Sequence, residues 1–358
     1  MKVLLLGDYS SLGVALKEGL LQLGIDVTLA ANGDGWKKIS GADTCLFPAS
    51  EGGQIDKFKK YVLYPLFTDK FKGYDIVQAP GTDIFSWRVG TKPFEKIIRD
   101  NGKFFINAAG VDYYLYHSWK NGKLKYDYYM YDDNEELCSE SNGKSISSIM
   151  KNIRCKKIMK MAYGIIPVVP YEYEISYSNF SNIRKPILLP VNTDKYGFMP
   201  NEVKNKIVFF HGINRAKDKG SGYIQKAMSK LQERYPNDVE CIVAERMPFD
   251  EYTRNLNRTN VVIDQCKSFG YGLNACISMA KGKIVLSGAE NAVTKYFNGD
   301  KCPVFNIRPD VKNIYNQMVR IIELKSEIPI LATESRRFIE KYHNYINIAK
   351  QYVDAWLE

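Results

Sequence analysis

A short basic loop in the second half of the chain has the residue types needed to bind phosphate. Arg215, Lys217 and Lys219 lie between a buried apolar run at 207–210 and a helical pattern that begins near Ile224. A guanidinium and an ammonium group beside a helix N-terminus can bind a diphosphate without a metal ion. A solvated basic turn is the alternative, because lysine and arginine are normally exposed. We favour the phosphate site, since position and composition agree.

A second segment of interest follows a predicted strand that ends at Asp264. Its glycines, Gly270 and Gly272, would let the backbone approach a ligand before a helix begins near Asn274. Asp264 could contact a ligand there or cap the helix, and the sequence leaves both roles open.

The first loop of the chain, 7–13, could present backbone N–H groups to an anion. Its glycine spacing is not GxGxxG, so the dinucleotide-binding fingerprint is absent. A tight turn between a strand and a helix explains this loop at least as well.

Strands of a sheet must position these loops. Short apolar runs in the sequence predict such strands. Runs bounded by polar loops and alternating with helical patterns indicate parallel sheets with right-handed crossovers. The predicted strands are 3–6, 27–30, 74–78, 104–107, 165–169, 207–210, 239–244, 261–264, 284–287 and 304–307.

The alternation falls into two halves, which predicts two α/β domains. We expect a first domain over 1–170, a Pro-rich and polar linker over 171–205, and a second domain over 206–334. Tyrosines crowd the stretch 113–142, which we interpret as an insertion or long functional loop. Residues 335–358 predict one long terminal helix that packs on the first domain.

Composition limits the classes of function. The 358 residues carry a net charge of +10, which fits an acidic ligand, a phosphate-bearing partner, an anionic membrane surface or nucleic acid. No nucleic-acid motif occurs, so we expect no nucleic-acid partner. The three histidines lack metal-ligand spacing, no DxD occurs, and we expect no metal. No apolar run is long enough to span a membrane. Seven scattered cysteines with no CxxC pair give no disulfide framework, so we expect a cytoplasmic protein. Peripheral contact at the inner face of the cell membrane is left open.

Ordered motifs in the second half carry a resemblance to a known family. They are Arg215, Lys219-Gly220, Tyr271-Gly272-Leu273, Met279-Ala280, Gly282-Lys283-Ile284-Val285 and, near the end, Phe338 to His343. In this order they resemble the C-terminal half of retaining glycosyltransferases of family 4 and its relatives. The resemblance implies the GT-B fold, in which two Rossmann-like domains face a central cleft and a terminal helix crosses back to the first domain.

The resemblance also implies roles for particular residues. Arg215 and Lys219 would hold the donor diphosphate and stabilise the leaving nucleotide, with Asp112 near the acceptor. For Asp112 and Glu290, a capping or loop-tying carboxylate is an equally good interpretation, and for His117 a structural hydrogen bond is the better one. The donor-side candidates are Gly212, Glu245, Asp264, Gly272, Leu273, Asn274 and Glu290, and the acceptor-side candidates are Ser10, Ser11 and His117.

Two positions depart from the family pattern. The two glutamates that the family places eight residues apart fall here on Phe269 and Ile277. Neither side chain can contact a donor sugar or a ribose hydroxyl as a carboxylate would. We expect a metal-independent, retaining transferase without a cofactor that moves a hexose-type unit from a nucleotide diphosphate sugar. Its expected acceptor is a glycan or lipid-linked molecule in surface-polysaccharide synthesis. The alternative is a glycosyltransferase-like protein that binds a partner without catalysis.

Overall fold

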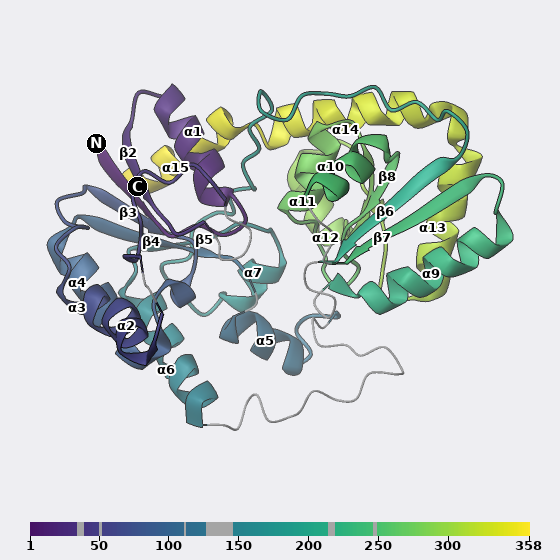
Figure 1. Cartoon of the computed structure of the whole chain (residues 1–358). Helices are drawn as coiled ribbons and strands as arrows, with labels where there is room; N and C mark the ends of the chain where they lie inside the picture. The colour runs from purple at the N-terminus through teal and green to yellow at the C-terminus, as the bar shows by residue number, and fades with distance from the viewer. Residues whose placement is uncertain (34–38, 50–51, 111, 127–145, 214–218, 246–248) are drawn as a thin grey trace.

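Two parallel five-stranded sheets organise the chain, as the computed structural model shows (Figure 1). The strand order is β2-β1-β3-β4-β5 in the first sheet and β10-β9-β8-β6-β7 in the second. The structure describes residues 1–33, 39–49, 52–110, 112–126, 146–213, 219–245 and 249–358.

The first sheet is built from short apolar strands that are buried on both faces. Strand β1 pairs in parallel with β2 on one side and β3 on the other, so Val3 lies between Val27 and Ile76. The strands are β1 (Lys2–Leu6), β2 (Asp26–Ala30), β3 (Ile76–Ala79), β4 (Lys103–Ala108) and β5 (Gly164–Pro167). The helical elements of this half are α1 (Leu12–Gln22), α2 (Gln54–Phe58), the π-turn η2 (Lys59–Leu63), α3 (Tyr64–Phe67), η3 (Thr82–Ile84), η4 (Trp87–Val89), α4 (Lys92–Asp100), α5 (Tyr113–Lys120), α6 (Ile146–Met161) and α7 (Glu172–Ser176).

The second sheet is parallel as well, and all seven residues of its longest buried strand, β6, are buried. Its strands are β6 (Ile207–Ile213), β7 (Val239–Glu245), β8 (Val261–Ile263), β9 (Ile284–Ser287) and β10 (Phe305–Asn306). Its helices are α9 (Ser221–Arg234), α10 (Phe249–Arg258), α11 (Leu273–Ala280), α12 (Asn291–Thr294), η6 (Lys295–Phe297), α13 (Val311–Glu323), η7 (Lys325–Glu327) and α14 (Ile328–Tyr342), followed by α15 (Tyr345–Leu357). The predicted α/β class with two parallel sheets is confirmed.

The tyrosine-rich stretch differs from its prediction where the structure describes it. Tyr113–Lys120 forms the helix α5, whereas the sequence analysis placed an irregular insertion there. The Asp112 side chain caps this helix, and Tyr114 packs against Tyr177 and Phe180. Of the rest of the predicted insertion, residues 127–142 lie outside the described residues.

The C-terminal segment is two helices, not the single helix predicted over 335–358. α14 packs on α11 and β9 of the second half, whereas α15 packs on α1 of the first (Figure 1). Gly19 permits this approach, because a Cβ there would lie 2.3 Å from the Tyr345 carbonyl oxygen. The break falls at His343, whose carbonyl accepts a hydrogen bond from the Val191 backbone N–H. Asn344 then caps α15 with its side chain. The chain therefore crosses back to the first domain through α15 alone.

The helix α6 shares a hydrophobic core with the first sheet and also buries an arginine. Ile158 and Met159 are buried, while the guanidinium of Arg154 donates to the backbone carbonyls of Thr82, Phe85 and Gly90. Within the described residues, none of the helices has the length and apolar character needed to cross a bilayer.

Candidate functional site

The carboxyl ends of the two sheets face each other, and the loops that follow β5 and β8 are in contact. The Glu172 carboxylate, after β5, accepts hydrogen bonds from the Ser268 hydroxyl and the Phe269 backbone N–H, after β8. Because loops at the carboxyl ends of parallel strands are where such sheets bind ligands, this junction is the candidate site.

A buried ion pair joins two loops of the second sheet at this junction. The Lys219 ammonium lies 2.6 Å from Asp264 Oδ1, and the side chains are 8% and 2% exposed. Asn274, in the first turn of α11, donates to the same oxygen at 3.1 Å. Burial alone raises the pKa of Asp264, but the charge of Lys219 and the hydrogen bonds from Lys219 and Asn274 outweigh it and lower the pKa. The carboxylate is thus ionised and ties the loop before α9 to the start of α11.

His211 supports this pair from inside the sheet. Its Nδ1 lies 2.8 Å from the Ile263 carbonyl oxygen, so it carries the proton, and its Nε2 accepts from the Ser221 hydroxyl. Burial lowers the pKa of His211 to about 4, which keeps the ring neutral. Gly212, a donor-side candidate, lies within β6 opposite Ala244, because the strand continues three residues beyond its predicted end.

Phe269, at one family glutamate position, is part of an aromatic cluster between the two halves of the chain. Its ring centroid lies 4.9 Å from those of both Tyr126 and Tyr171. Phe269 is only 6% exposed. The position therefore contributes packing between the halves. The other such position, Ile277, lies within α11.

Glu172 is the residue of the junction that the sequence analysis did not identify. It is 2% exposed, and burial raises its pKa to about 7 despite hydrogen bonds from the Phe269 and Gly270 backbone and the Ser268 hydroxyl. It belongs to α7, inside the segment predicted to be a linker. Ser268 is 96 residues away in the chain, so no local pattern indicates the contact.

Glu290 is tied by residues from both halves of the chain. It accepts hydrogen bonds from the Tyr126 hydroxyl at 2.8 Å and from Arg308 Nε at 2.9 Å. Burial acts to raise the pKa of Glu290, but the bonds from Arg308 and Tyr126 outweigh it and lower the pKa. Glu290 thus ties its loop to Tyr126 and Arg308, which is the structural alternative to a donor contact.

In the first domain, Asp112 caps α5 and His117 lies within it. Asp112 Oδ1 accepts from the backbone N–H groups of Tyr114 and Leu115, each at 3.0 Å. Burial raises the pKa of Asp112 to about 7 although these two bonds oppose the shift. The His117 ring packs on Tyr113 with ring centroids 4.1 Å apart. Burial and, to a smaller extent, the positive charge of Lys120 lower the pKa of His117.

In the loop 7–13, two backbone N–H groups donate to the loop's own aspartate. Asp8 accepts from the N–H groups of Ser11 at 3.1 Å and Gly13 at 2.6 Å. Ser10 and Ser11 take positive φ angles of 55° and 72°, which fits a tight turn into α1. These contacts favour the structural interpretation of the loop over an anion site.

The remaining candidates are spread along the edge of the second sheet. Gly272 is the N-cap of α11 and Leu273 is its first residue, beside Asp264. Glu245 is the exposed last residue of β7, opposite Ile213. Arg215 and Lys217 lie outside the described residues. The structure thus brings together Lys219, Asp264, Asn274 and Gly272, with Phe269 and Glu172 beside them.

Comparison with known proteins relates the fold to solved structures. The sequence matches no protein-family model and no curated protein. The structure is similar to sucrose-phosphate synthase from Thermosynechococcus elongatus, with 15% identity, a TM-score of 0.63 and coverage of 99% of this chain and 98% of that one. It is similar to Anabaena HepE in complex with UDP and glucose, with 13% identity, a TM-score of 0.61 and coverage of 99% and 98%. A glycosyltransferase from Rickettsia africae has 12% identity, a TM-score of 0.58 and coverage of 99% and 97%.

These similarities establish the fold over the whole chain. The two parallel sheets and the returning α15 form the GT-B fold, as the sequence resemblance implied. At this level of identity they establish the fold alone, because one fold serves many functions.

Proposed function

We propose that this protein is a glycosyltransferase that moves a sugar from a nucleotide diphosphate sugar to a glycan or lipid-linked acceptor. One observation carries the proposal. The Lys219–Asp264 pair and Asn274 fix two loops of the second sheet at the N-terminus of α11, at the edge that faces the first domain. Structural similarity to HepE, which was solved with UDP and glucose, supports this choice of donor.

Positive charge for the donor diphosphate comes, in this proposal, chiefly from Arg215 and Lys217. Lys219 already neutralises Asp264, so its part is to hold the loop that carries Arg215. The backbone N–H groups of Gly272 and Leu273, at the start of α11, supply further donors to the phosphate oxygens. This division of roles refines the sequence-based assignment of Lys219 as a direct phosphate ligand.

The proposed reaction breaks the bond between the anomeric carbon and the phosphate oxygen and joins that carbon to an acceptor oxygen. The nucleoside diphosphate leaves against Arg215, and the acceptor hydroxyl proton passes to the departing phosphate. By the family resemblance we propose retention of the anomeric configuration, independence of metal ions and a role in surface-polysaccharide synthesis. Asp112 and His117 would face the acceptor. The protein as a whole would make peripheral contact with the inner face of the cell membrane.

A second candidate is a protein that binds a nucleotide sugar or a partner without turnover. Phe269 packs between Tyr126 and Tyr171, and Glu290 is tied to Tyr126 and Arg308. Two positions that the resemblance assigns to the donor thus hold the two halves together, which favours binding over catalysis.

An assay of nucleoside diphosphate release separates the two candidates. The full chain would be incubated with UDP-, GDP- and ADP-sugars, with and without glycan and lipid-linked acceptors. A transferase is supported if nucleotide release depends on an acceptor and is lost in Arg215→Ala. The same release should be kept in Arg337→Ala, which changes an exposed arginine of α14. Donor binding without release with every acceptor supports the second candidate. Neither binding nor release would reject the transferase and the binding of a nucleotide sugar alike.

A further inference from the structure

The segment from Gln54 to Phe67, which comprises α2, η2 and α3, carries large apolar side chains on its outside. Ile55 is 73% exposed, Phe58 54% and Phe67 75%. Tyr61 and Leu63 are exposed by 40% and 38%. Exposed apolar residues that occur singly need no explanation, but five on one short segment indicate an interaction site.

Lysines alternate with these apolar residues. Lys57 and Lys59 flank Phe58 in the sequence, and Lys60 follows them. From Gln54 to Lys72 there are five lysines against two aspartates. One of the two aspartates, Asp69, already forms ion pairs with Lys96 and Lys72. The segment therefore combines a net positive charge with an exposed apolar face.

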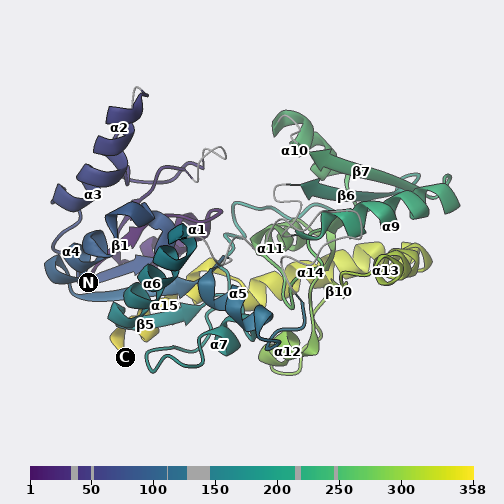
Figure 2. The same ribbon diagram turned by 90° about the horizontal axis from the view of Figure 1, so that it is seen from below.

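The segment is attached to the body of the protein at its C-terminal end. Pro65 is buried, and Tyr61 packs on Phe47 with ring centroids 5.1 Å apart. In Figure 2, α2 stands away from the first sheet beyond α3 and α4. Ile55 and Phe58, on the projecting turn, thus have their apolar surface toward the solvent.

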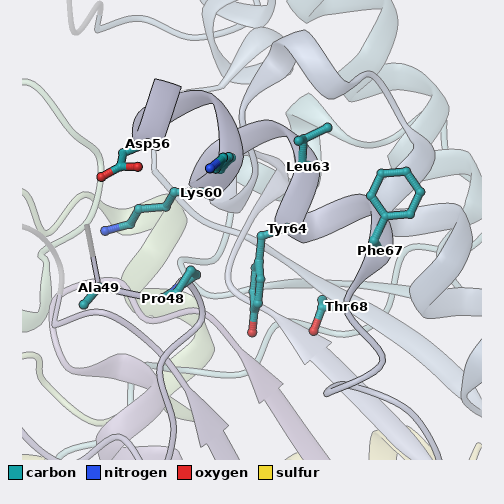
Figure 3. Close-up of a pocket in the computed structure, with 9 residues that line it drawn as sticks. Pro48, Ala49, Asp56, Lys60, Leu63, Tyr64, Phe67 and Thr68 are labelled. Atoms are coloured by element: carbon teal, nitrogen blue, oxygen red, sulfur yellow. The ribbon is translucent and has the colours of Figure 1, made fainter. Parts of the chain in front are cut away.

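A hollow of about 650 Å³ runs along one side of the segment. Lys60, Leu63, Tyr64 and Phe67 line it from the helices, opposite Pro48 and Ala49 (Figure 3). Leu63 and Phe67 lie about one turn apart at one end of the hollow, and Lys60 lies at the other. Ammonium groups and apolar side chains therefore border the same surface.

This combination favours a lipid surface over a protein partner. The cores of protein interfaces are depleted in lysine. Helices that lie in the plane of a bilayer place lysines beside phenylalanine and leucine, with the apolar face among the acyl chains and the ammonium groups at anionic headgroups.

We propose that Gln54–Phe67 is a membrane-docking segment that inserts Ile55, Phe58 and Phe67 into the headgroup region of an anionic bilayer. Lys57, Lys59 and Lys60 bind the headgroup phosphates. The choice of a bilayer as the partner rests on the proposed function. The segment Gln54–Phe67 is the surface that contacts this bilayer. Docking through the first domain places the candidate site next to a lipid-linked acceptor.

Flotation of the full chain with lipid vesicles tests the proposal. We expect association with phosphatidylcholine vesicles that contain phosphatidylglycerol, weaker association with phosphatidylcholine alone, and release by salt. The triple variant Ile55→Ser, Phe58→Ser and Phe67→Ser should bind about tenfold more weakly or worse, because its apolar surface is lost. Lys57→Gln, Lys59→Gln and Lys60→Gln together should abolish the preference for the anionic vesicles.

Ile330→Ser is the matched control, because Ile330 is 61% exposed on α14 in the other half of the chain. It should leave flotation unchanged. The proposal is overturned if the wild type does not float with anionic vesicles, or if the triple serine variant floats as well as Ile330→Ser does. It is equally overturned if the triple variant only converts a dimer into a monomer in sedimentation while vesicle binding persists.

Donor binding is measured in parallel, so that the two proposals can fail separately. The triple serine variant should keep any rise in melting temperature that a nucleotide sugar gives the wild type, because the segment lies outside the candidate site. Flotation without a donor effect rejects the proposed function only, and a donor effect without flotation rejects the docking segment only.

Discussion

Lys219 and Asp264 form an ion pair that is almost entirely buried, with 2.6 Å between Nζ and Oδ1. The pair connects the loop before α9 to the end of β8, and through Asn274 to the start of α11. Its first role is therefore to hold the candidate site in shape.

Removing one partner of this pair should be costly. Lys219→Met leaves the Asp264 carboxylate buried without its counter-charge, which costs about 3–5 kcal/mol of unfolding free energy. Urea unfolding measures the loss. Arg258→Met is the control, because it breaks the exposed pair with Glu240 and should cost about 1 kcal/mol or less. Equal losses in the two variants would contradict a structural role for the buried pair.

Replacing both partners should recover much of that stability. Lys219→Met with Asp264→Leu leaves no unpaired charge, and buried pairs are often replaceable by apolar residues without loss. The double variant should be more stable to urea than Lys219→Met alone. A double variant that is less stable than the single one would show that Asp264 has a further essential partner.

Glu172 should make the stability of the fold depend on pH. Its pKa of about 7 in the folded chain lies above the ordinary value of 4.5, so the folded state binds the proton more tightly than the unfolded state. The stabilisation is present below the ordinary pKa and is lost as the pH rises through the folded pKa. The melting temperature of the wild type should therefore fall relative to Glu172→Gln between about pH 5 and about pH 8.

Asp112 provides the control for this titration, because burial raises its pKa to about 7 as well. Asp112→Asn should remove its own part of the pH dependence and leave the part that Glu172→Gln removes. A difference between wild type and Glu172→Gln that does not vary with pH would refute the titration of Glu172 in this range.

The hydrogen bond between Tyr126 and Glu290 should contribute to stability across the two halves. Tyr126→Phe removes a donor to a carboxylate, at a cost of about 1.5–3 kcal/mol. In a Glu290→Gln background the same change should cost less, since the acceptor is no longer charged. Calorimetric melting of the four proteins gives the coupling energy. Additive effects would mean that this bond is not formed in solution.

Phe269 should behave as a core residue. Phe269→Ala should cost about 3–5 kcal/mol, because it empties the space between Tyr126 and Tyr171. Phe269→Glu, which restores the family glutamate, should be at least as destabilising, since it places a carboxylate among aromatic rings. Stability is again measured by urea unfolding. A stable Phe269→Glu variant would show that the side chain faces an open donor pocket.

The strands were predictable because each depends on a local pattern. A run such as 284–287, apolar and closed by polar residues, forms β9 at that position. The break between α14 and α15 was not predictable, since Leu189 and Val191 impose it from another part of the chain. The Leu189 carbonyl lies 2.8 Å from His343 Nδ1, and Val191 pairs with the backbone on both sides of the break.

The candidate site was predictable only in part. Strand-loop-helix position located Lys219 and Asp264, since Lys219 follows one predicted strand and Asp264 ends another strand of the same sheet. The ion pair between them depends on the packing of two loops and is not visible in the sequence. The roles of Glu172 and Tyr126 are set by contacts between the two halves, which no spacing of residues within one half can indicate.

The most direct test of the central claim is the melting temperature of the full chain with a panel of nucleotide sugars. A donor that binds the folded state raises the melting temperature by mass action. We predict a rise with at least one nucleotide diphosphate sugar, its loss in Arg215→Ala, and its persistence in Arg337→Ala. No rise with any donor, or a rise that Arg215→Ala leaves unchanged, would contradict the account.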